Sequence, residues 1–269
     1  MKPIDSFNDL LNKFSHQRLS TFGLMIMASS HHQTLDEIST NVLKELIDQH
    51  HLIVLRGFQQ PNKDELTHYA EHIGPLLAWD FGVVMEMRAH EDAKNYLFTE
   101  GHVPFHWDGA FHQEPSYLLF HCIEAPSVNS GGETLFANTN AIWEHSNQDE
   151  RNQWRHIQLT YETEKLAHYG GKITIPLVQT HPRTQKTILR FAEPVPDHML
   201  NPVTVNIDYL ENKNTFLQMM ADRCYQQAYC YTHKWENNDI LFADNFSLIH
   251  ARHAFKKISP RHLRRIQIL

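Results

Sequence analysis

Cysteine is scarce in this chain. Its 269 residues include only Cys122, Cys224 and Cys230, which form no Cys-x-x-Cys pair. Scattered cysteines in odd number do not build a disulfide framework, so we expect a reducing, cytoplasmic environment. Long hydrophobic runs are also lacking, because the apolar stretch at 22–28 is short, contains Gly23 and has no basic flank. We therefore expect neither a signal peptide nor a membrane span.

Basic residues are fewer than acidic ones, with 24 Lys and Arg against 31 Asp and Glu and a formal net charge of -7. This balance argues against nucleic acid or an anionic membrane as a partner, since both select basic surfaces. Linkers rich in Pro, Gly or Ser are absent from the sequence, and the 41% hydrophobic content suffices for a sizeable core. We therefore predict a single domain over residues 1–269.

Hydrophobic periodicity predicts helices near the N-terminus and mostly short strands beyond. Residues 36–50 have the pattern of an amphipathic helix, and Asn62 with Glu65 is a capping pair that opens a second helix ending at Gly74. Further segments follow the same rules: strands at 52–55, 117–123, 157–162, 173–179, 187–191, 239–243 and 262–268, and helices near 140–155 and 211–225. Many short strands separated by turn residues predict a sandwich or barrel.

Histidine is abundant, with 21 residues. In His106-Trp107-Asp108 the histidine and the aspartate are two positions apart, and such residues in a strand point to the same face. They could bind one metal ion from one side, and His250, far downstream, could add a third ligand. Two histidines and one carboxylate form the facial triad of non-haem Fe(II) oxygenases, which leaves iron positions open. The pattern therefore predicts an oxygen-activating enzyme.

One His-x-Asp match is weak evidence in a chain so rich in histidine. A second match at 90–92 lies among charged residues and is typical of an exposed pair. His106 differs, because the apolar segment 103–105 precedes it and Trp107 follows it. A buried carboxylate beside a buried histidine needs a charge partner or a metal. On these residues alone, both a metal site and a metal-free pair remain open.

Near the C-terminus, Arg261 and Arg265 fall on one face of a strand and Arg264 on the other. An enzyme that binds a dicarboxylate needs a buried arginine, because guanidinium matches carboxylate in a bidentate way. The alternative is a basic edge strand, in which these arginines, with Lys256 and Lys257, discourage pairing with another sheet.

These motifs occur in one order along the chain: His106-Trp107-Asp108, Gly131-Gly132-Glu133-Thr134, Asp244-Asn245 before His250, and Arg261 with Arg265. Over roughly 50–269 they resemble the taurine dioxygenase family of Fe(II)/α-ketoglutarate oxygenases. Further segments resemble the oxygenases that act after isonitrile synthases, namely the B proteins of paerucumarin (pyoverdine chromophore) and rhabduscin-type pathways. These segments are Val103–Gly109, Phe120-His121-Cys122, Ala167-His168-Tyr169, His181-Pro182-Arg183, Ile188–Phe191, Glu193-Pro194, Ala243-Asp244-Asn245 and Pro260–Arg265.

The resemblance implies a mainly β fold with flanking α-helices, a double-stranded β-helix or jelly roll. It also implies Fe(II) as cofactor, with α-ketoglutarate and O2 as co-substrates. The implied roles are iron ligation by His106, Asp108 and His250, binding of the distal α-ketoglutarate carboxylate by Thr134 and Arg261, and a place for Arg265 near the keto-acid end or the substrate's anionic group.

For the substrate, the resemblance implies an isonitrile derived from an aromatic amino acid, tyrosine first, supplied by an isonitrile synthase. The implied product has an alkene beside the isonitrile, with the carboxylate kept or lost. Arg190, Tyr169 and Lys172 are the expected substrate contacts, and Lys172 or Arg190 could pair with the carboxylate. A surface position for Lys172 stays open, since lysine is usually exposed.

Two other functions stay open at this point. One is a hydroxylase of a small sulfonate or carboxylate, which would use the same iron chemistry on another substrate. The other, of a different class, is a jelly-roll protein that binds a metal or ligand without catalysis. The complete triad and the two arginines favour an enzyme over this last alternative.

Overall fold

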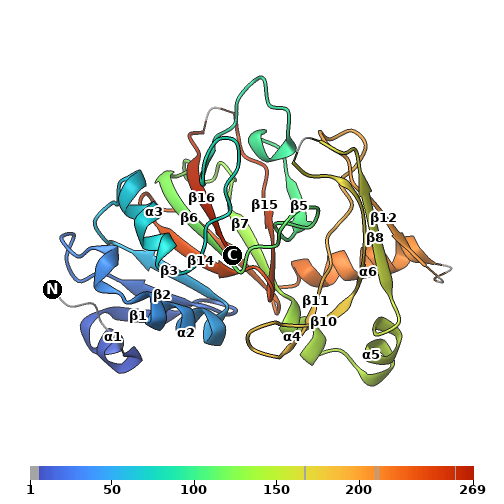
Figure 1. Ribbon diagram of the computed structural model, residues 1–269, viewed down its shortest axis with the longest axis horizontal. Coiled ribbons are helices and arrows are strands. Elements are labelled where there is room, and N and C mark those ends of the chain that lie inside the picture. The colour runs from blue at the N-terminus through green and yellow to red at the C-terminus, as the bar shows by residue number, and fades with distance from the viewer. Residues whose placement is uncertain (1–5, 167, 209, 211, 258) are drawn as a thin grey trace.

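Two facing β-sheets form the centre of the computed structural model, which describes residues 6–166, 168–208, 210, 212–257 and 259–269 (Figure 1). The larger sheet has the order β1 (Ser15–Arg18), β2 (Leu24–Met27), β3 (Leu52–Arg56), β14 (Ile240–Asp244), β6 (Tyr117–Glu124), β16 (His262–Ile268) and β4 (Val84–Met87). The smaller sheet has the order β13 (Cys230–His233), β7 (Thr134–Asn138), β15 (Leu248–Arg252) and β5 (Val103–His106). Apart from the parallel pair of β2 with β3, the strands within these sheets pair antiparallel.

The two sheets pack through the side chains that alternate toward each other. Phe120 of β6 and Leu263 of β16 share a core cluster with Phe136 of β7 and Leu248 of β15. Because side chains in a strand alternate between faces, Arg265 and Gln267 point to the same interior as Leu263. This alternation places polar side chains inside an otherwise apolar sandwich.

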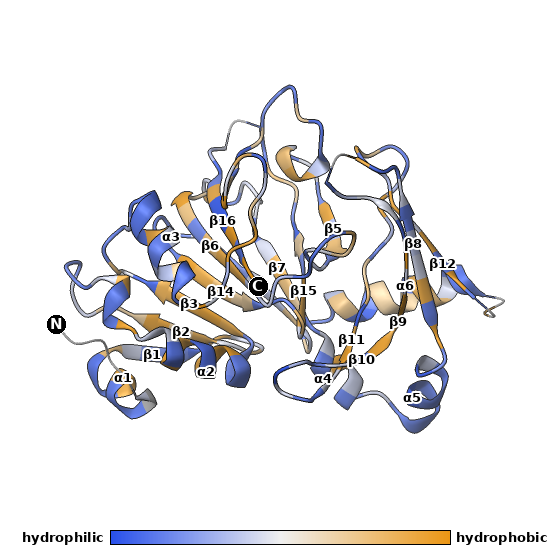
Figure 2. Cartoon of the chain, viewed as in Figure 1, coloured by the Kyte–Doolittle hydropathy of each residue, from blue (hydrophilic) through white to orange (hydrophobic). Residues whose placement is uncertain are grey.

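Helices cover the outer face of the larger sheet. The helices α2 (Thr40–His50) and α3 (Lys63–Glu71) bury their apolar sides against β3, β14 and β16, and α1 (Phe7–Lys13) lies beside β1. The central strands are mostly hydrophobic in Figure 2, whereas the exposed sides of α2 and α3 are hydrophilic. Among the described residues, none of the helices combines the length and the hydropathy needed to cross a bilayer.

A second layer covers the outer face of the smaller sheet, on the right of Figure 1. Its elements are α4 (Thr139–Glu144), α5 (Gln148–Trp154), α6 (Lys213–Tyr225), the sheet of β12 (Thr204–Ile207), β8 (Gln158–Thr163) and β9 (Gly171–Pro176), and the pair β10 (Val178–Thr180) and β11 (Thr187–Leu189). Two short 3-10 helices, Leu35–Glu37 and Tyr96–Phe98, complete the described elements.

The mainly β architecture with flanking helices is as predicted, and the differences are local. The segment expected to be helical at 140–155 divides into α4 and α5, because Asn147 caps a new helix through Glu150 N–H. The strand expected at 173–179 divides after Pro176, which cannot donate in a ladder. The helix expected at 211–225 is observed from Lys213, and position 211 lies outside the described residues.

Candidate metal centre

His106, Asp108 and His250 come together between the two sheets. The antiparallel pairing of β15 with β5 sets His250 opposite His106, and Asp108 follows β5. Oδ1 of Asp108 is 3.8 Å from Nε2 of each histidine, and the ligand atoms of all three residues lie within 4.8 Å of one another. Within the described part of the chain, this is the one group of three or more such side chains close enough to share an ion.

The protonation of His106 suits a metal. Its Nδ1 lies 2.8 Å from the carbonyl oxygen of Pro104, and a carbonyl only accepts, so Nδ1 carries the proton. Nε2 then holds a lone pair, and this buried atom has no hydrogen-bond partner among the described residues. Burial lowers the pKa of His106 and holds the pKa of His250 well below its usual value, so both rings are neutral. A buried nitrogen with a free lone pair beside a carboxylate fits a divalent ion.

Asp108 is held by its surroundings as an ionised carboxylate. Burial is the largest influence and opposes its ionisation, but the Arg265 guanidinium, the two histidines and the hydrogen bond from Gln267 together lower the pKa of Asp108. Arg265 Nη1 donates to Oδ1 at 3.1 Å, and Gln267 Nε2 donates to Oδ2 at 2.6 Å. The side chain of Asn245 accepts from the Asp108 N–H and donates to its carbonyl, each at 3.0 Å. Both the carboxylate and the backbone of Asp108 are therefore fixed.

Arg261 is a buried cation. Its Nε donates to the Gly132 carbonyl oxygen at 3.0 Å, and it forms no ion pair with a carboxylate of the described residues. Burial and the nearby Arg252 lower the pKa of Arg261 to about 9, so it remains charged at neutral pH. A desolvated guanidinium with no counter-charge suits a bound carboxylate. Thr134 is also buried, and its Oγ1 accepts from Trp235 Nε1 at 2.9 Å, which leaves its own proton free to donate.

Arg265 retains hydrogen-bonding capacity. One of its terminal nitrogens contacts Asp108 and the other contacts Met85 Sδ at 3.2 Å, a weak acceptor. Its Nε is buried and has no partner within the described chain. This guanidinium can therefore take an anionic group from a ligand beside the three candidate ligands.

A cavity of about 410 Å³ opens beside His106 and Asp108. Aromatic side chains form a large part of its wall, and Tyr169 is one of them, held by a 3.1 Å hydrogen bond from Asn95. The aromatic lining residues are Trp79, Phe81, Tyr96, Phe98, Trp107, Phe111, Tyr161 and Tyr169. A mostly apolar pocket with a few convergent polar groups is the usual form of a small-molecule site.

The structure places two of the predicted substrate contacts outside the cavity wall. Lys172 lies on β9 with its side chain exposed, 3.7 Å from Glu162, and it is not part of the cavity wall. Arg190 is fully buried behind the wall, where it donates to Glu114 at 2.7 Å and to the Asn245 carbonyl at 2.6 Å. A buried arginine that already has these partners stabilises the fold around Trp107 rather than a ligand.

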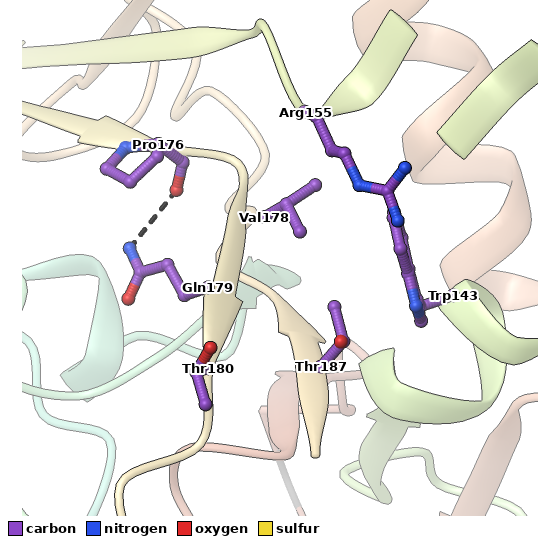
Figure 3. Close-up of a pocket in the computed structure, with 7 residues that line it drawn as sticks. All are labelled: Trp143, Arg155, Pro176, Val178, Gln179, Thr180 and Thr187. Atoms are coloured by element: carbon purple, nitrogen blue, oxygen red, sulfur yellow. Dashed lines mark hydrogen bonds between the residues drawn. The ribbon is translucent and has the colours of Figure 1, made fainter. Parts of the chain in front are cut away.

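A second pocket, of about 600 Å³, lies among α4, α5, β10 and β11 (Figure 3). The guanidinium of Arg155 stacks over the Trp143 ring at 5.3 Å, and Gln179 donates to the Pro176 carbonyl. Its described lining includes no acidic side chain, histidine or cysteine. The chemistry available at this pocket is therefore limited to surface contacts, and the candidate site is the cavity beside His106.

Sequence reasoning missed the roles of three residues that organise the site. Asn245 was noticed only as part of a motif, and its role in holding Asp108 required the structure. Gln267 lies two positions after Arg265 on the same strand face, so the alternation of β16 could have identified it. Trp79 was considered as a residue that lines the pocket or belongs to the core, but its hydrogen bond to Gln267 could not be predicted, because it joins segments far apart in the chain.

Comparisons with known proteins agree with this geometry. Residues 26–267 match the family described as "Taurine catabolism dioxygenase TauD, TfdA family". The chain is 42% identical over 262 residues to 3-((Z)-2-isocyanoethenyl)-1H-indole synthase of Fischerella ambigua, with 96% of both chains covered. It is 34% identical to the tyrosine isonitrile desaturase of Pseudomonas aeruginosa, with 92% of this chain and 87% of that one covered.

Among solved structures, the crystal structure of PvcB from Pseudomonas aeruginosa superposes with a TM-score of 0.81 at 30% identity, covering 100% of this chain and 94% of that one. PvcB is described as an Fe, alpha-ketoglutarate dependent oxygenase from an isonitrile synthetic pathway. The similarity confirms the predicted jelly-roll fold with flanking helices.

Proposed function

We propose a function from the premise that this chain belongs to the TauD, TfdA family of dioxygenases. It is an Fe(II)/α-ketoglutarate-dependent oxygenase that desaturates an isonitrile derived from an aromatic amino acid. The observation that carries the proposal is the unpartnered Nε2 of His106, which lies beside Asp108 and His250 at the edge of an aromatic-walled cavity.

We assign iron ligation to His106, Asp108 and His250. The support is their mutual distances, the neutral rings and the ionised carboxylate. Arg261, a buried cation without a carboxylate partner among the described residues, is assigned to the distal carboxylate of α-ketoglutarate, with Thr134 as a second donor. With iron, α-ketoglutarate and O2 bound, the centre supplies the oxidant that removes hydrogen from the substrate.

The protein's own part is to bind, orient and exclude water. Arg265 can donate its free N–H to the substrate carboxylate or to the keto-acid end. The aromatic walls around Trp79 and Tyr169 pack on the substrate ring and leave the adjacent carbon atoms facing His106 and Asp108. The orientation of the substrate then favours removal of two hydrogens over addition of a hydroxyl group.

The overall reaction balances with the substrate losing two hydrogens. α-Ketoglutarate and O2 become succinate, CO2 and water, and the substrate gains a carbon–carbon double bond beside the isonitrile. If the substrate carboxylate is lost as well, a second CO2 appears. We infer that the enzyme supplying this substrate converts an amino acid into its isonitrile, because the amine nitrogen must already carry the extra carbon.

The substrate ring can be phenolic or indolic. Tyrosine was the expected parent, but the relative at 42% identity is named for an indole and the relative at 34% for tyrosine isonitrile. We therefore propose aromatic amino-acid isonitriles as the class, with the indole included.

The test is incubation of anaerobically iron-loaded protein with α-ketoglutarate and either tyrosine or tryptophan isonitrile, followed by oxygen. We expect succinate with a product lighter by two hydrogens, or by two hydrogens and CO2, from one of the two. A product heavier by one oxygen would contradict desaturation and support a hydroxylase. His250→Ala, which removes a candidate ligand, is the control for iron-independent chemistry.

We also infer that residues 1–269 act as one domain. The support is that strands from distant parts of the chain share one sheet, with β3 beside β14 and β6 between β14 and β16. The candidate site also joins distant segments of the chain, because His106 of β5 lies opposite His250 of β15.

A further inference from the structure

A hydrogen-bond chain joins the aromatic wall of the cavity to the candidate ligand Asp108. Trp79 Nε1 donates to Gln267 Oε1 at 2.9 Å, and Gln267 Nε2 donates to Asp108 Oδ2 at 2.6 Å. Gln267 is buried in β16, and the backbone N–H of Leu77 donates to the Gln267 carbonyl at 2.9 Å. The segment that carries Trp79 is therefore attached to the strand that carries Gln267.

The chemistry of the two neighbours fixes the orientation of the Gln267 amide. An indole N–H can only donate, so it must face the amide oxygen. The Asp108 oxygen Oδ2, 2.6 Å away on the other side, faces the amide nitrogen, which can only donate. Both requirements select the same orientation of Gln267, and a flipped amide would lose both hydrogen bonds.

The orientation of the Gln267 amide determines which oxygen of Asp108 is left to face a metal ion. Oδ2 is held by Gln267, while Oδ1 is 3.8 Å from Nε2 of His106 and of His250. Arg265 Nη1 lies 3.1 Å from Oδ1 and 3.0 Å from Oδ2, so it does not distinguish the two oxygens, and its Nε has no partner among the described residues. Gln267, in contrast, has its side-chain oxygen and nitrogen both bound within the protein.

Trp79 has a second role in the same place. Its ring lines the cavity, stacked on Phe81 with centroids 6.3 Å apart and tilted against His112 at 5.3 Å. The residue that forms part of the substrate wall thus also donates the hydrogen bond that orients Gln267. A substitution of Trp79 would alter the wall and the metal ligand together.

We propose that Gln267 and Trp79 are positioning residues that hold Asp108 as a one-oxygen metal ligand, Trp79 acting through Gln267. The inference rests on the proposed function only in taking Asp108 as a ligand. It predicts that losing either residue weakens metal binding even when no substrate is present. Outer partners of ligand side chains typically contribute about 10- to 100-fold in metal affinity.

The experiment measures Mn(II) binding by titration calorimetry to the full chain without substrate, with thermal unfolding as a check of folding. Gln267→Leu should lower the affinity about 10-fold or more, and Trp79→Phe, which keeps an aromatic ring but removes the N–H, should lower it by less. The matched control is Trp143→Phe, the same change in the remote pocket of Figure 3, which should leave the affinity unchanged.

A double variant tests whether Trp79 acts through Gln267. In the Gln267→Leu background, Trp79→Phe should cause no further loss of Mn(II) affinity, because the hydrogen bond it removes has already gone. Additive losses would overturn the proposed chain, as would wild-type affinity in a folded Gln267→Leu variant.

His250→Ala separates this inference from the function it rests on. If His250→Ala loses Mn(II) binding while Gln267→Leu retains it, the positioning role fails and the metal site stands. If His250→Ala binds Mn(II) as the wild type does, the metal site itself is wrong and both proposals fall.

Discussion

His250 lies opposite His106 in the antiparallel pair of β15 and β5, with ring centroids 4.3 Å apart. The pairing register determines this proximity, so the two histidines are brought together by backbone hydrogen bonds rather than by flexible loops. Sites built on strands are held more closely than sites on loops. The third residue, Asp108, follows β5 and is held by Asn245, so the whole cluster is preorganised.

Removal of a candidate ligand should abolish metal binding. His106→Ala or Asp108→Ala takes away one of three donors, and two donors do not hold Fe(II) tightly against water. We expect loss of tight Fe(II) binding and of succinate formation, measured by equilibrium dialysis and by product analysis. Full activity of either variant with substoichiometric iron would show that the ligands are other residues.

Arg261→Ala should raise the α-ketoglutarate requirement more than the iron requirement. The variant removes a buried charge assigned to the distal carboxylate, and a hydrogen bond to a charged group is worth about 10- to 100-fold in affinity. The measurement is the α-ketoglutarate KM at saturating iron. Arg264→Ala is the matched control, because Arg264 is an arginine three positions further along, in β16, and its side chain pairs with Glu86. An unchanged α-ketoglutarate KM in Arg261→Ala would show that another residue binds the distal carboxylate.

Lys172→Ala should leave the substrate KM unchanged, and Arg190→Met should mainly lower stability. Lys172 is exposed and lies outside the cavity wall, whereas Arg190 is fully buried with Glu114 as its partner. Arg190→Met removes hydrogen bonds to Glu114 and to the Asn245 carbonyl, so we expect the free energy of unfolding in urea to fall by about 1 to 3 kcal/mol. A large rise in the substrate KM for Lys172→Ala would show that Lys172 contacts the substrate.

Asp244 should make stability depend on acid pH. Burial opposes its ionisation, but the hydrogen bond from His181 and the charge of the adjacent Arg183 hold the pKa of Asp244 well below its usual value. A depressed folded-state pKa gives stability that is complete above the unfolded pKa of about 4 and is lost as pH falls toward the folded value. Asp244→Asn should therefore cost about 3 kcal/mol near neutral pH and progressively less below about pH 4. A cost independent of pH would contradict the role of its charge.

Local signals in the sequence predicted a mainly β fold and the common orientation of His106 and Asp108. Alternation of side chains in strands placed His106 and Asp108 on one face, and the same rule put Arg261, Leu263 and Arg265 together. The resemblance to a known family then supplied the partner His250, which no spacing rule could have found.

The substrate contacts were less predictable, because they depend on where loops and sheets meet. Arg190 and Lys172 carry charges suited to a carboxylate, but one is enclosed behind Trp107 and the other lies on the exposed face of β9. Their positions follow from tertiary packing, to which charge patterns give no guide. The hydrogen bond between Trp79 and Gln267 was not predicted for the same reason, since it joins a connecting segment to the last strand.

The central claim, desaturation at this iron site, is tested most directly by turnover under isotopically labelled dioxygen. The iron-loaded enzyme is given α-ketoglutarate and the accepted aromatic isonitrile under 18O2, and succinate and the organic product are analysed by mass. Desaturation predicts one labelled oxygen in succinate and none in the alkene, because the second oxygen leaves as water. Labelled oxygen retained in the organic product would contradict the account and identify the enzyme as a hydroxylase.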